Sequence, residues 1–243
     1  MIAYLTSSPC IDGANRAILN NQNSFLTRLR ADLPENPRCL YVASSPDDSD
    51  ATCRYGAEIF CAFAEAGIHF SHYDILDRQN EEFAADLVMD SNFIILAGGH
   101  VPTQNAFFNE IGLEVLLQDY EGVIMGISAG SMNAASVVYM QPEDPGESDP
   151  EFVRFAPGLG LTYANICPHY QKVKDMILDG KRLFEDITYP DSEGNCFFAL
   201  PDGSYLRIDE EGTLLFGEGY LICDGQLEQI SWDGAVVNLD ELE

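Results

Sequence analysis

The first half of the chain alternates short apolar runs with amphipathic segments, and this alternation constrains the fold more than any other feature. Apolar runs of strand length occupy residues 2–6, 39–43, 68–73, 93–97 and 123–127. Helices are predicted between them, at residues 25–33, 51–66, 81–89 and 102–119. Neighbouring parallel strands need long crossover connections, which helices usually provide. The sequence therefore predicts an α/β fold with a doubly wound, mostly parallel sheet and helices on both faces.

The pattern changes after residue 135. Residues 141–160 are rich in Pro, Gly, Asp and Glu, which is typical of a loop. A strand-like run at 163–167 precedes a predicted helix at 173–184. From Cys196 onward, short β runs separated by Asp-Gly and Glu-Glu-Gly predict an antiparallel C-terminal extension. We find no linker that would divide the chain, so a single domain over residues 1–243 is predicted.

Acidic residues dominate the charge of the chain, with 40 Asp and Glu against 12 Lys and Arg and a net charge of −28. Such a protein repels phosphate backbones and anionic lipids, so we expect no nucleic-acid partner and no membrane partner. No run approaches the roughly 20 apolar residues of a membrane span, and the N-terminus lacks the pattern of a signal peptide. We therefore expect a cytoplasmic protein. The sequence leaves the oligomeric state open, a homodimer included.

The cysteines and histidines give no sign of a metal or cofactor site. The seven cysteines are scattered without a Cys-x-x-Cys pair, and the four histidines form no His-x-x-x-His. We therefore predict reduced, buried thiols and no metal ion. Because no Gly-x-Gly-x-x-Gly and no Gly-Lys-Ser/Thr motif occurs, a nucleotide cofactor is not expected either.

The fifth apolar run leads directly into Gly126-Ile127-Ser128-Ala129-Gly130. A Gly-x-Ser-x-Gly sequence between a buried strand and a helix is typical of a nucleophile elbow, a tight turn that exposes the serine Oγ. Glycines two residues on either side avoid Cβ clashes in such a turn. Ser128 is therefore the candidate nucleophile. The amide of Ala129 is a candidate donor to an oxyanion.

A serine nucleophile needs a neighbouring base, usually a histidine. His169 follows a predicted strand beyond the elbow, and we predict that it serves as the base for Ser128. The pair Gly98-Gly99 lies at the end of the preceding buried strand, where functional residues of such sheets gather. We expect the Gly99 amide to be the second oxyanion donor, and Gly98 and His100 to contact the substrate.

The third member of such a site is a carboxylate that orients the histidine. Four candidates lie in one acidic loop between the nucleophile and the base, namely Glu143, Asp144, Glu147 and Asp149. The residues alone do not decide which of them reaches the imidazole.

Several segments, in this order, resemble the peptidase E family of serine peptidases, also called S51: residues 96–99, 126–130, 158–161 with 167–170, and 199–204. The resemblance implies a fold similar to class I glutamine amidotransferases, with Ser128 as nucleophile and His169 as base. The family's third member is an aspartate about fifteen positions past the serine, which corresponds to Glu143 here. Glutamate serves in the cyanophycinase branch. Glu143 is therefore our first choice, with Asp144 or Glu147 as alternatives.

The resemblance also implies an activity, hydrolysis of small peptides, with dipeptides that carry an N-terminal acidic residue as the leading case. An acidic side chain would need a cation, and Arg154, Lys172 and Arg16 are the candidates. Residues 171–174 depart from the Arg-rich pattern of cyanophycinases, which disfavours cyanophycin as the substrate. Two alternatives stay open: an amidase or esterase on the same fold, and a binding protein with an incomplete triad.

Overall fold

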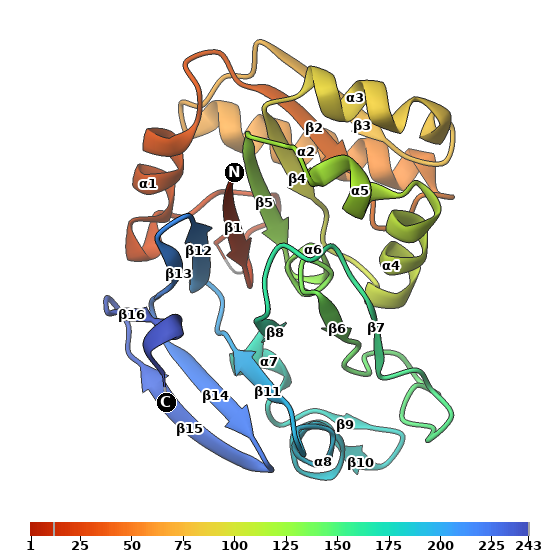
Figure 1. Ribbon diagram of the computed structural model, residues 1–243, viewed down its shortest axis with the longest axis vertical. Coiled ribbons are helices and arrows are strands. Elements are labelled where there is room, and N and C mark those ends of the chain that lie inside the picture. Colours follow the sequence, from red (N-terminus) through yellow and green to blue (C-terminus); the bar gives the residue numbers. More distant parts are fainter. Residues whose placement is uncertain (12, 243) are drawn as a thin grey trace.

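The computed structural model describes residues 1–11 and 13–242, and an eight-stranded sheet forms the centre of this part (Figure 1). The strand order is β16-β13-β12-β1-β5-β4-β2-β3. The parallel part comprises β1 (Ile2–Thr6), β2 (Arg38–Val42), β3 (His72–Leu76), β4 (Phe93–Leu96) and β5 (Val123–Ile127). The antiparallel part comprises β12 (Tyr205–Asp209), β13 (Gly212–Phe216) and β16 (Val236–Asn238). The predicted α/β class and mostly parallel sheet are confirmed.

Helices cover both faces of this sheet, as predicted. One apolar core packs against α1 (Phe25–Asp32), which follows the short turn η1 (Gln22–Ser24), and α2 (Ser49–Glu65). The other packs against α3 (Ala84–Asp90), which follows the short turn η2 (Glu81–Phe83), and against α4 (Val101–Glu110) and α5 (Leu113–Leu117). Along β1, Ala3 and Leu5 face the second core and Tyr4 faces the first, because successive strand side chains point to opposite faces. No helix among the described residues is long and apolar enough to cross a membrane.

The register of the parallel strands brings their carboxyl ends to one edge. Thr6 pairs with Ile127, and Val42 pairs with Leu96. The loops that follow β1, β2, β4 and β5 therefore start from the same edge of the sheet. In Figure 1, β1 and β5 point toward the half of the molecule that contains β8, α7 and β11.

That half holds a second, four-stranded sheet of order β15-β14-β11-β8. Its strands are β8 (Asn165–Cys167), β11 (Cys196–Ala199), β14 (Gly219–Cys223) and β15 (Gln226–Ser231). Strands β8 and β11 are parallel, whereas β11, β14 and β15 pair antiparallel. Further elements are α6 (Ala129–Met132), β6 (Val137–Tyr139), β7 (Phe155–Pro157), α7 (Tyr170–Val173), α8 (Tyr189–Asp191) and η4 (Leu239–Glu241). The predicted antiparallel C-terminal strands are confirmed, and they divide between the two sheets.

Three predicted elements differ from the structure. The strand predicted at 68–73 begins only at His72, and the helix predicted at 102–119 is two helices separated at Gly112, where φ is 63°. The helix predicted at 173–184 is wrong beyond Val173. Its place is taken by a hairpin of β9 (Ile177–Leu178) and β10 (Lys181–Arg182), followed by a π-helical segment, η3 (Leu183–Thr188). Asp179 and Gly180 both have positive φ, 52° and 81°, which suits a two-residue hairpin turn and ends a helix.

The cysteines depart from the expectation of reduced, buried thiols. Cys196 and Cys223 lie opposite each other on β11 and β14 and form a disulfide. The free thiols of Cys53 and Cys61 on α2 are exposed. Of the remaining three, Cys39 and Cys167 are buried free thiols, as predicted, and Cys10 is half-buried.

Candidate active site

Ser128 lies at the tight turn between β5 and α6. Its backbone has φ 47° and ψ −106°, an uncommon conformation for a residue with a side chain. The surrounding hydrogen bonds hold it there: its amide donates to the carbonyl of Thr6 (3.0 Å), and its carbonyl accepts from the amides of Ser131 and Met132 (2.9 and 3.0 Å). The strand-turn-helix geometry predicted from Gly-x-Ser-x-Gly is therefore present.

The two glycines of the motif are required by close backbone approaches. A Cβ atom on Gly126 would lie 2.7 Å from the amide nitrogen of Ser131. A Cβ atom on Gly130 would lie 2.3 Å from the carbonyl oxygen of Leu96, at the end of β4. The first glycine lets α6 fold back over β5, and the second lets it pack against β4.

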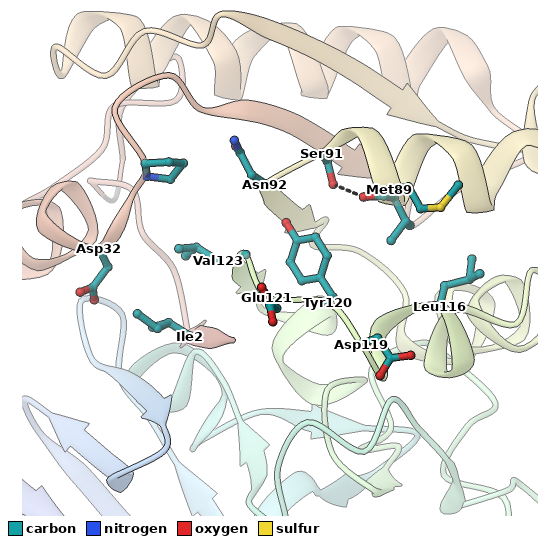
Figure 2. Close-up of a pocket in the computed structure, with 13 residues that line it drawn as sticks. Ile2, Asp32, Met89, Ser91, Asn92, Leu116, Asp119, Tyr120, Glu121 and Val123 are labelled. Atoms are coloured by element: carbon teal, nitrogen blue, oxygen red, sulfur yellow. Dashed lines mark hydrogen bonds between the residues drawn. The ribbon is translucent and has the colours of Figure 1, made fainter.

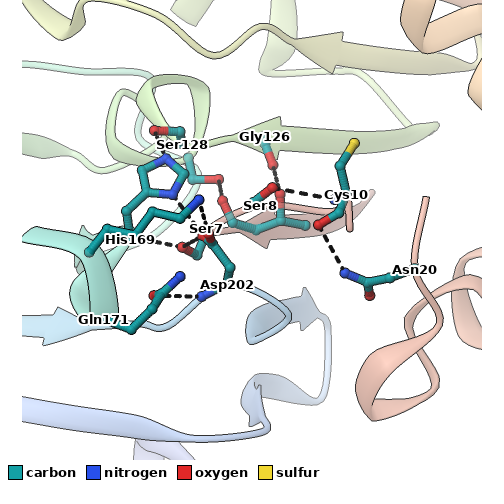
Figure 3. Close-up of polar contacts among 12 residues, drawn as sticks. Ser7, Ser8, Cys10, Asn20, Gly126, Ser128, His169, Gln171 and Asp202 are labelled. Carbon is teal, nitrogen blue, oxygen red and sulfur yellow. Dashed lines mark hydrogen bonds and ion pairs between the residues drawn. The ribbon is translucent and has the colours of Figure 1, made fainter. Parts of the chain in front are cut away.

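The imidazole of His169 contacts Ser128 on one side and a carboxylate on the other (Figure 3). Its Nε2 lies 2.9 Å from Oγ of Ser128, and its Nδ1 lies 2.7 Å from Oδ1 of Asp202. Ser7 ties the same groups together, since its Oγ accepts the His169 amide (2.7 Å) and donates to Asp202 (2.8 Å). The ring is thus fixed at both nitrogens and through its own backbone.

The surroundings of Asp202 favour its ionised form. Only 9% of its side chain is exposed. Burial disfavours the charged form, but hydrogen bonds and charge from His169 and Lys172 outweigh it and hold the pKa of Asp202 well below its usual range. Lys172 Nζ lies 2.8 Å from Oδ2, and the Asp202 amide donates to Oε1 of Gln171 (3.0 Å). An ionised carboxylate at this position favours an Nδ1-protonated ring, whose Nε2 can accept the serine proton.

The expectation that the acidic loop supplies the carboxylate next to His169 is wrong. Oε1 of Glu143 accepts the amide of Val101 (3.2 Å), and Oε1 of Glu147 contacts Nε2 of His100 (2.7 Å). Asp144 is exposed. The carboxylate on Nδ1 is Asp202 instead, because β8 and β11 are parallel neighbours whose carboxyl ends meet, with Cys167 opposite Ala199.

One feature of the sequence points to Asp202 as a candidate site residue. The segment 199–204 belongs to the motifs that resemble the peptidase E family, although Asp202-Gly203 by itself indicates only a turn. An acidic residue three positions past a strand end is a candidate for a site at that edge. Asp202 lies near His169 because β8 pairs with β11, and the spacing of residues along the sequence does not reveal this pairing.

The two expected oxyanion donors lie beside Ser128, one in space and one in sequence. Gly99 lines the same pocket as Ser128 and His169, and Ala129 directly follows the serine. A Cβ atom on Gly99 would lie 2.4 Å from Oγ of Ser44, so this position requires glycine. Within residues 1–11 and 13–242, the amides of Gly99 and Ala129 donate to no protein acceptor. Both are therefore available to a ligand.

The pocket beside Ser128 is small, about 60 Å³, and mostly apolar. Besides Gly99, Ser128 and His169, it is lined by Val101, Met132, Gln141, Pro142, Glu143, Pro168, Val173, Met176 and Leu183. A much larger cavity, of about 600 Å³, lies at the amino ends of the parallel strands, beside Ile2, Asn92 and Val123 (Figure 2). That cavity is lined by none of the predicted site residues.

The cations expected to hold an acidic substrate side chain are engaged elsewhere. Each contacts a carboxylate: Arg154 pairs with Asp191, Lys172 with Asp202 and Arg16 with Glu65. None of the three lines the pocket beside Ser128. Gly98 and His100, expected to contact the substrate, are not among its lining residues either.

One group of potential metal ligands lies near the site. The ligand atoms of His100, Asp144 and Glu147 all lie within 4.8 Å of one another. However, His100 and Glu147 already bond each other, and Glu147 also accepts two backbone amides. Both ring nitrogens of His100 and both carboxylate oxygens of Glu147 are therefore engaged by protein groups.

A half-buried serine on a strand-turn-helix elbow, with a histidine on its hydroxyl and a carboxylate behind the ring, defines the class of serine hydrolases. The model of Peptidase family S51 matches residues 12–216, and the chain belongs to this family. The protein is therefore a serine peptidase, and the resemblance to peptidase E seen in the sequence is confirmed.

Solved structures share the fold. The structure of a peptidase from an acI-B1 Actinobacterium has a TM-score of 0.67 and 16% identity, over 98% of this chain and 96% of its own. A proposed peptidase E protein from Listeria monocytogenes EGD-e has a TM-score of 0.61 and 14% identity, over 95% and 98%. No curated protein matches the chain significantly.

Proposed function

We propose that Ser128, His169 and Asp202 form a catalytic triad that hydrolyses amide bonds of small peptides. The observation that carries this proposal is the pair of contacts on one imidazole, 2.9 Å to the serine Oγ and 2.7 Å to the carboxylate. Both distances are those of hydrogen bonds. The imidazole lies between the serine hydroxyl and the carboxylate, so it can accept the proton of the nucleophile.

The mechanism follows from the position of each group. His169 Nε2 takes the proton as Ser128 Oγ attacks the scissile carbonyl, and Asp202 stabilises the imidazolium that forms. The amides of Gly99 and Ala129 donate to the oxyanion of the tetrahedral intermediate. His169 then protonates the leaving amine, and an acyl-enzyme ester remains on Ser128. Water, deprotonated by His169, attacks this ester and restores the free serine.

The pocket lining favours a small or apolar residue beside the cleaved bond. Its wall is mostly aliphatic, and no Lys or Arg is among its lining residues. An N-terminal acidic side chain, the leading case implied by the sequence, would have no cationic partner in this pocket. With a net charge of −28, the protein also repels anionic peptides at long range. We therefore propose a dipeptidase or short-peptide peptidase that prefers neutral N-terminal residues.

Labelling with a fluorophosphonate probe tests the proposal. We expect the wild type to form a covalent adduct at Ser128, and the variant Ser128→Ala to show neither adduct nor peptide hydrolysis. Turnover by Ser128→Ala equal to that of the wild type would contradict the proposal. A wild type without an adduct would instead favour the binding protein with an incomplete triad. Comparing dipeptides with matched esters and simple amides separates a peptidase from an amidase or esterase.

A further inference from the structure

The acidic loop, residues 142–149, is held in a defined conformation by its neighbours. The amide of Gly146 donates to Oδ2 of Asp179 (2.8 Å). Arg154 donates to the carbonyl of Glu147 (2.8 Å), and Lys181 donates to the carbonyl of Ser148 (2.7 Å). The loop therefore presents its side chains from fixed positions.

Glu147 and His100 fix the part of this loop nearest to the pocket. Oε2 of Glu147 accepts the backbone amides of Glu143 (2.9 Å) and Asp144 (3.0 Å), while its Oε1 contacts Nε2 of His100. The other ring nitrogen of His100 contacts Oγ1 of Thr103 (2.7 Å). His100 and Glu147 thus act through the backbone at residue 143, and they are positioning residues.

The side chain held by this arrangement is Glu143. It lines the pocket together with Ser128 and His169, and its Oε1 accepts the amide of Val101. Within residues 1–11 and 13–242, no Lys or Arg forms an ion pair with Glu143. Glu143 is exposed to solvent and lines a mostly apolar pocket, and a carboxylate in such a position favours a ligand that brings a positive charge.

A peptide substrate carries such a charge next to its first carbonyl. The backbone bonds N–Cα and Cα–C place the α-ammonium nitrogen roughly 2.5 Å from that carbonyl carbon. A group that binds the ammonium must therefore lie in the same pocket as the serine that attacks the carbonyl. Glu143 meets this requirement, whereas Asp144 and Glu147 are not among the pocket-lining residues.

We propose that Glu143 binds the α-ammonium group of the substrate and restricts cleavage to the first peptide bond. This inference rests on the proposed serine mechanism and adds a substrate specificity to it. The substrates are peptides whose N-terminal residue has a free amine and an uncharged side chain. The apolar wall of the pocket takes that side chain, and the carboxylate takes its amine.

The test compares leucine p-nitroanilide with N-acetyl-leucine p-nitroanilide. We expect the wild type to cleave the free-amine substrate at least tenfold better. Glu143→Gln should lower kcat/KM for the free-amine substrate by about tenfold to a hundredfold, mainly through KM, because a charge-assisted hydrogen bond is lost. Cleavage of the acetylated substrate should stay unchanged, and Glu143→Asp should recover part of the preference.

The control Glu151→Gln removes the same charge from an exposed side chain outside the pocket, and it should keep the wild-type preference. Fluorophosphonate labelling of Glu143→Gln at the wild-type rate would verify that Ser128 is still reactive. The inference is overturned if the labelled wild type cleaves both substrates equally, if it leaves the free-amine substrate intact, or if Glu143→Gln keeps the preference. Absence of labelling in the wild type would overturn the serine mechanism itself.

Discussion

The Nδ1 atom of His169 lies 2.7 Å from Oδ1 of Asp202, although 33 positions separate the two residues in the chain. The parallel pairing of β8 and β11 explains this proximity. His169 follows the end of β8 by two residues, and Asp202 follows the end of β11 by three. Since adjacent parallel strands end at one edge, the two loops meet there. The proposed base and its carboxylate partner are thus brought together by the second sheet, while the central sheet positions Ser128.

Replacing Asp202 tests this relationship. We expect Asp202→Asn to lower kcat by about 10³- to 10⁴-fold with little change in KM, because an amide no longer favours the Nδ1-protonated ring. Steady-state kinetics on a neutral dipeptide measures the effect. Glu143→Gln should act mainly on KM instead. A large loss of kcat in Glu143→Gln, together with near-normal kcat in Asp202→Asn, would mean that Glu143 of the acidic loop, and not Asp202, is the catalytic carboxylate.

The depressed pKa of Asp202 makes a second prediction, for acid stability. Its pKa is lower in the folded state than the unfolded value of about 3.9. The unfolded state therefore binds protons first, and the stability that this carboxylate contributes is complete above about pH 4 and is lost as the pH falls further. The groups that face it are His169, Lys172 and Ser7.

Urea unfolding of the wild type and Asp202→Asn measures this contribution. We expect the variant to be less stable at pH 7, and the difference in unfolding free energy to shrink between pH 4 and pH 2. Asp179, which is exposed and whose pKa is also lowered, offers a comparison: Asp179→Asn should give a smaller difference at pH 7. A difference between wild type and Asp202→Asn that grows on acidification would contradict the assignment.

The parallel half of the fold is predictable because its signals are local. The strands β1, β2, β4 and β5 are apolar runs bounded by loops, and β5 leads directly into the glycine-flanked serine. The predicted helix at 173–184 fails because the apolar side chains of this segment also suit a hairpin. There the Asp179-Gly180 turn outweighs helical spacing.

The candidate site is predictable only in part. Ser128 and His169 each follow a strand that is visible in the sequence, and they meet as expected. The sequence points to the acidic loop for the partner of His169, because that loop lies between the two in the chain. Nearness in sequence is a poor guide here, since the pairing of β8 with β11 is long-range. The same loop contributes Glu143 to the pocket, in contact with Val101 rather than with the imidazole.

Gly130, two positions after Ser128, should be intolerant of any side chain. Gly130→Ala places a Cβ atom 2.3 Å from the Leu96 carbonyl oxygen, so α6 must move away from β4. We expect a loss of about 3 kcal/mol in unfolding free energy, with loss of fluorophosphonate labelling in the molecules that remain folded. Thermal and urea unfolding measure the first effect.

Gly160→Ala is the matched control for that substitution. Gly160 has φ 69°, and a Cβ atom at this position would meet no other atom within 4 Å, so only backbone strain of about 1 kcal/mol is expected. Equal destabilisation by the two alanines would mean that close packing of α6 on β4 is not what Gly130 provides.

The Cys196–Cys223 disulfide should stabilise the second sheet. It joins β11 to β14 and encloses a loop with a sequence separation of 27, for which the expected stabilisation is about 3 kcal/mol. Dithiothreitol should therefore lower the Tm of the wild type. The double variant Cys196→Ser with Cys223→Ser should show the lower Tm already and should not respond to the reductant. Because Asp202 lies only three residues beyond β11, reduction should also slow peptide hydrolysis under conditions in which the central sheet stays folded. A wild type whose Tm and activity are both insensitive to dithiothreitol, with the bond shown by mass spectrometry to be reduced, would contradict this role.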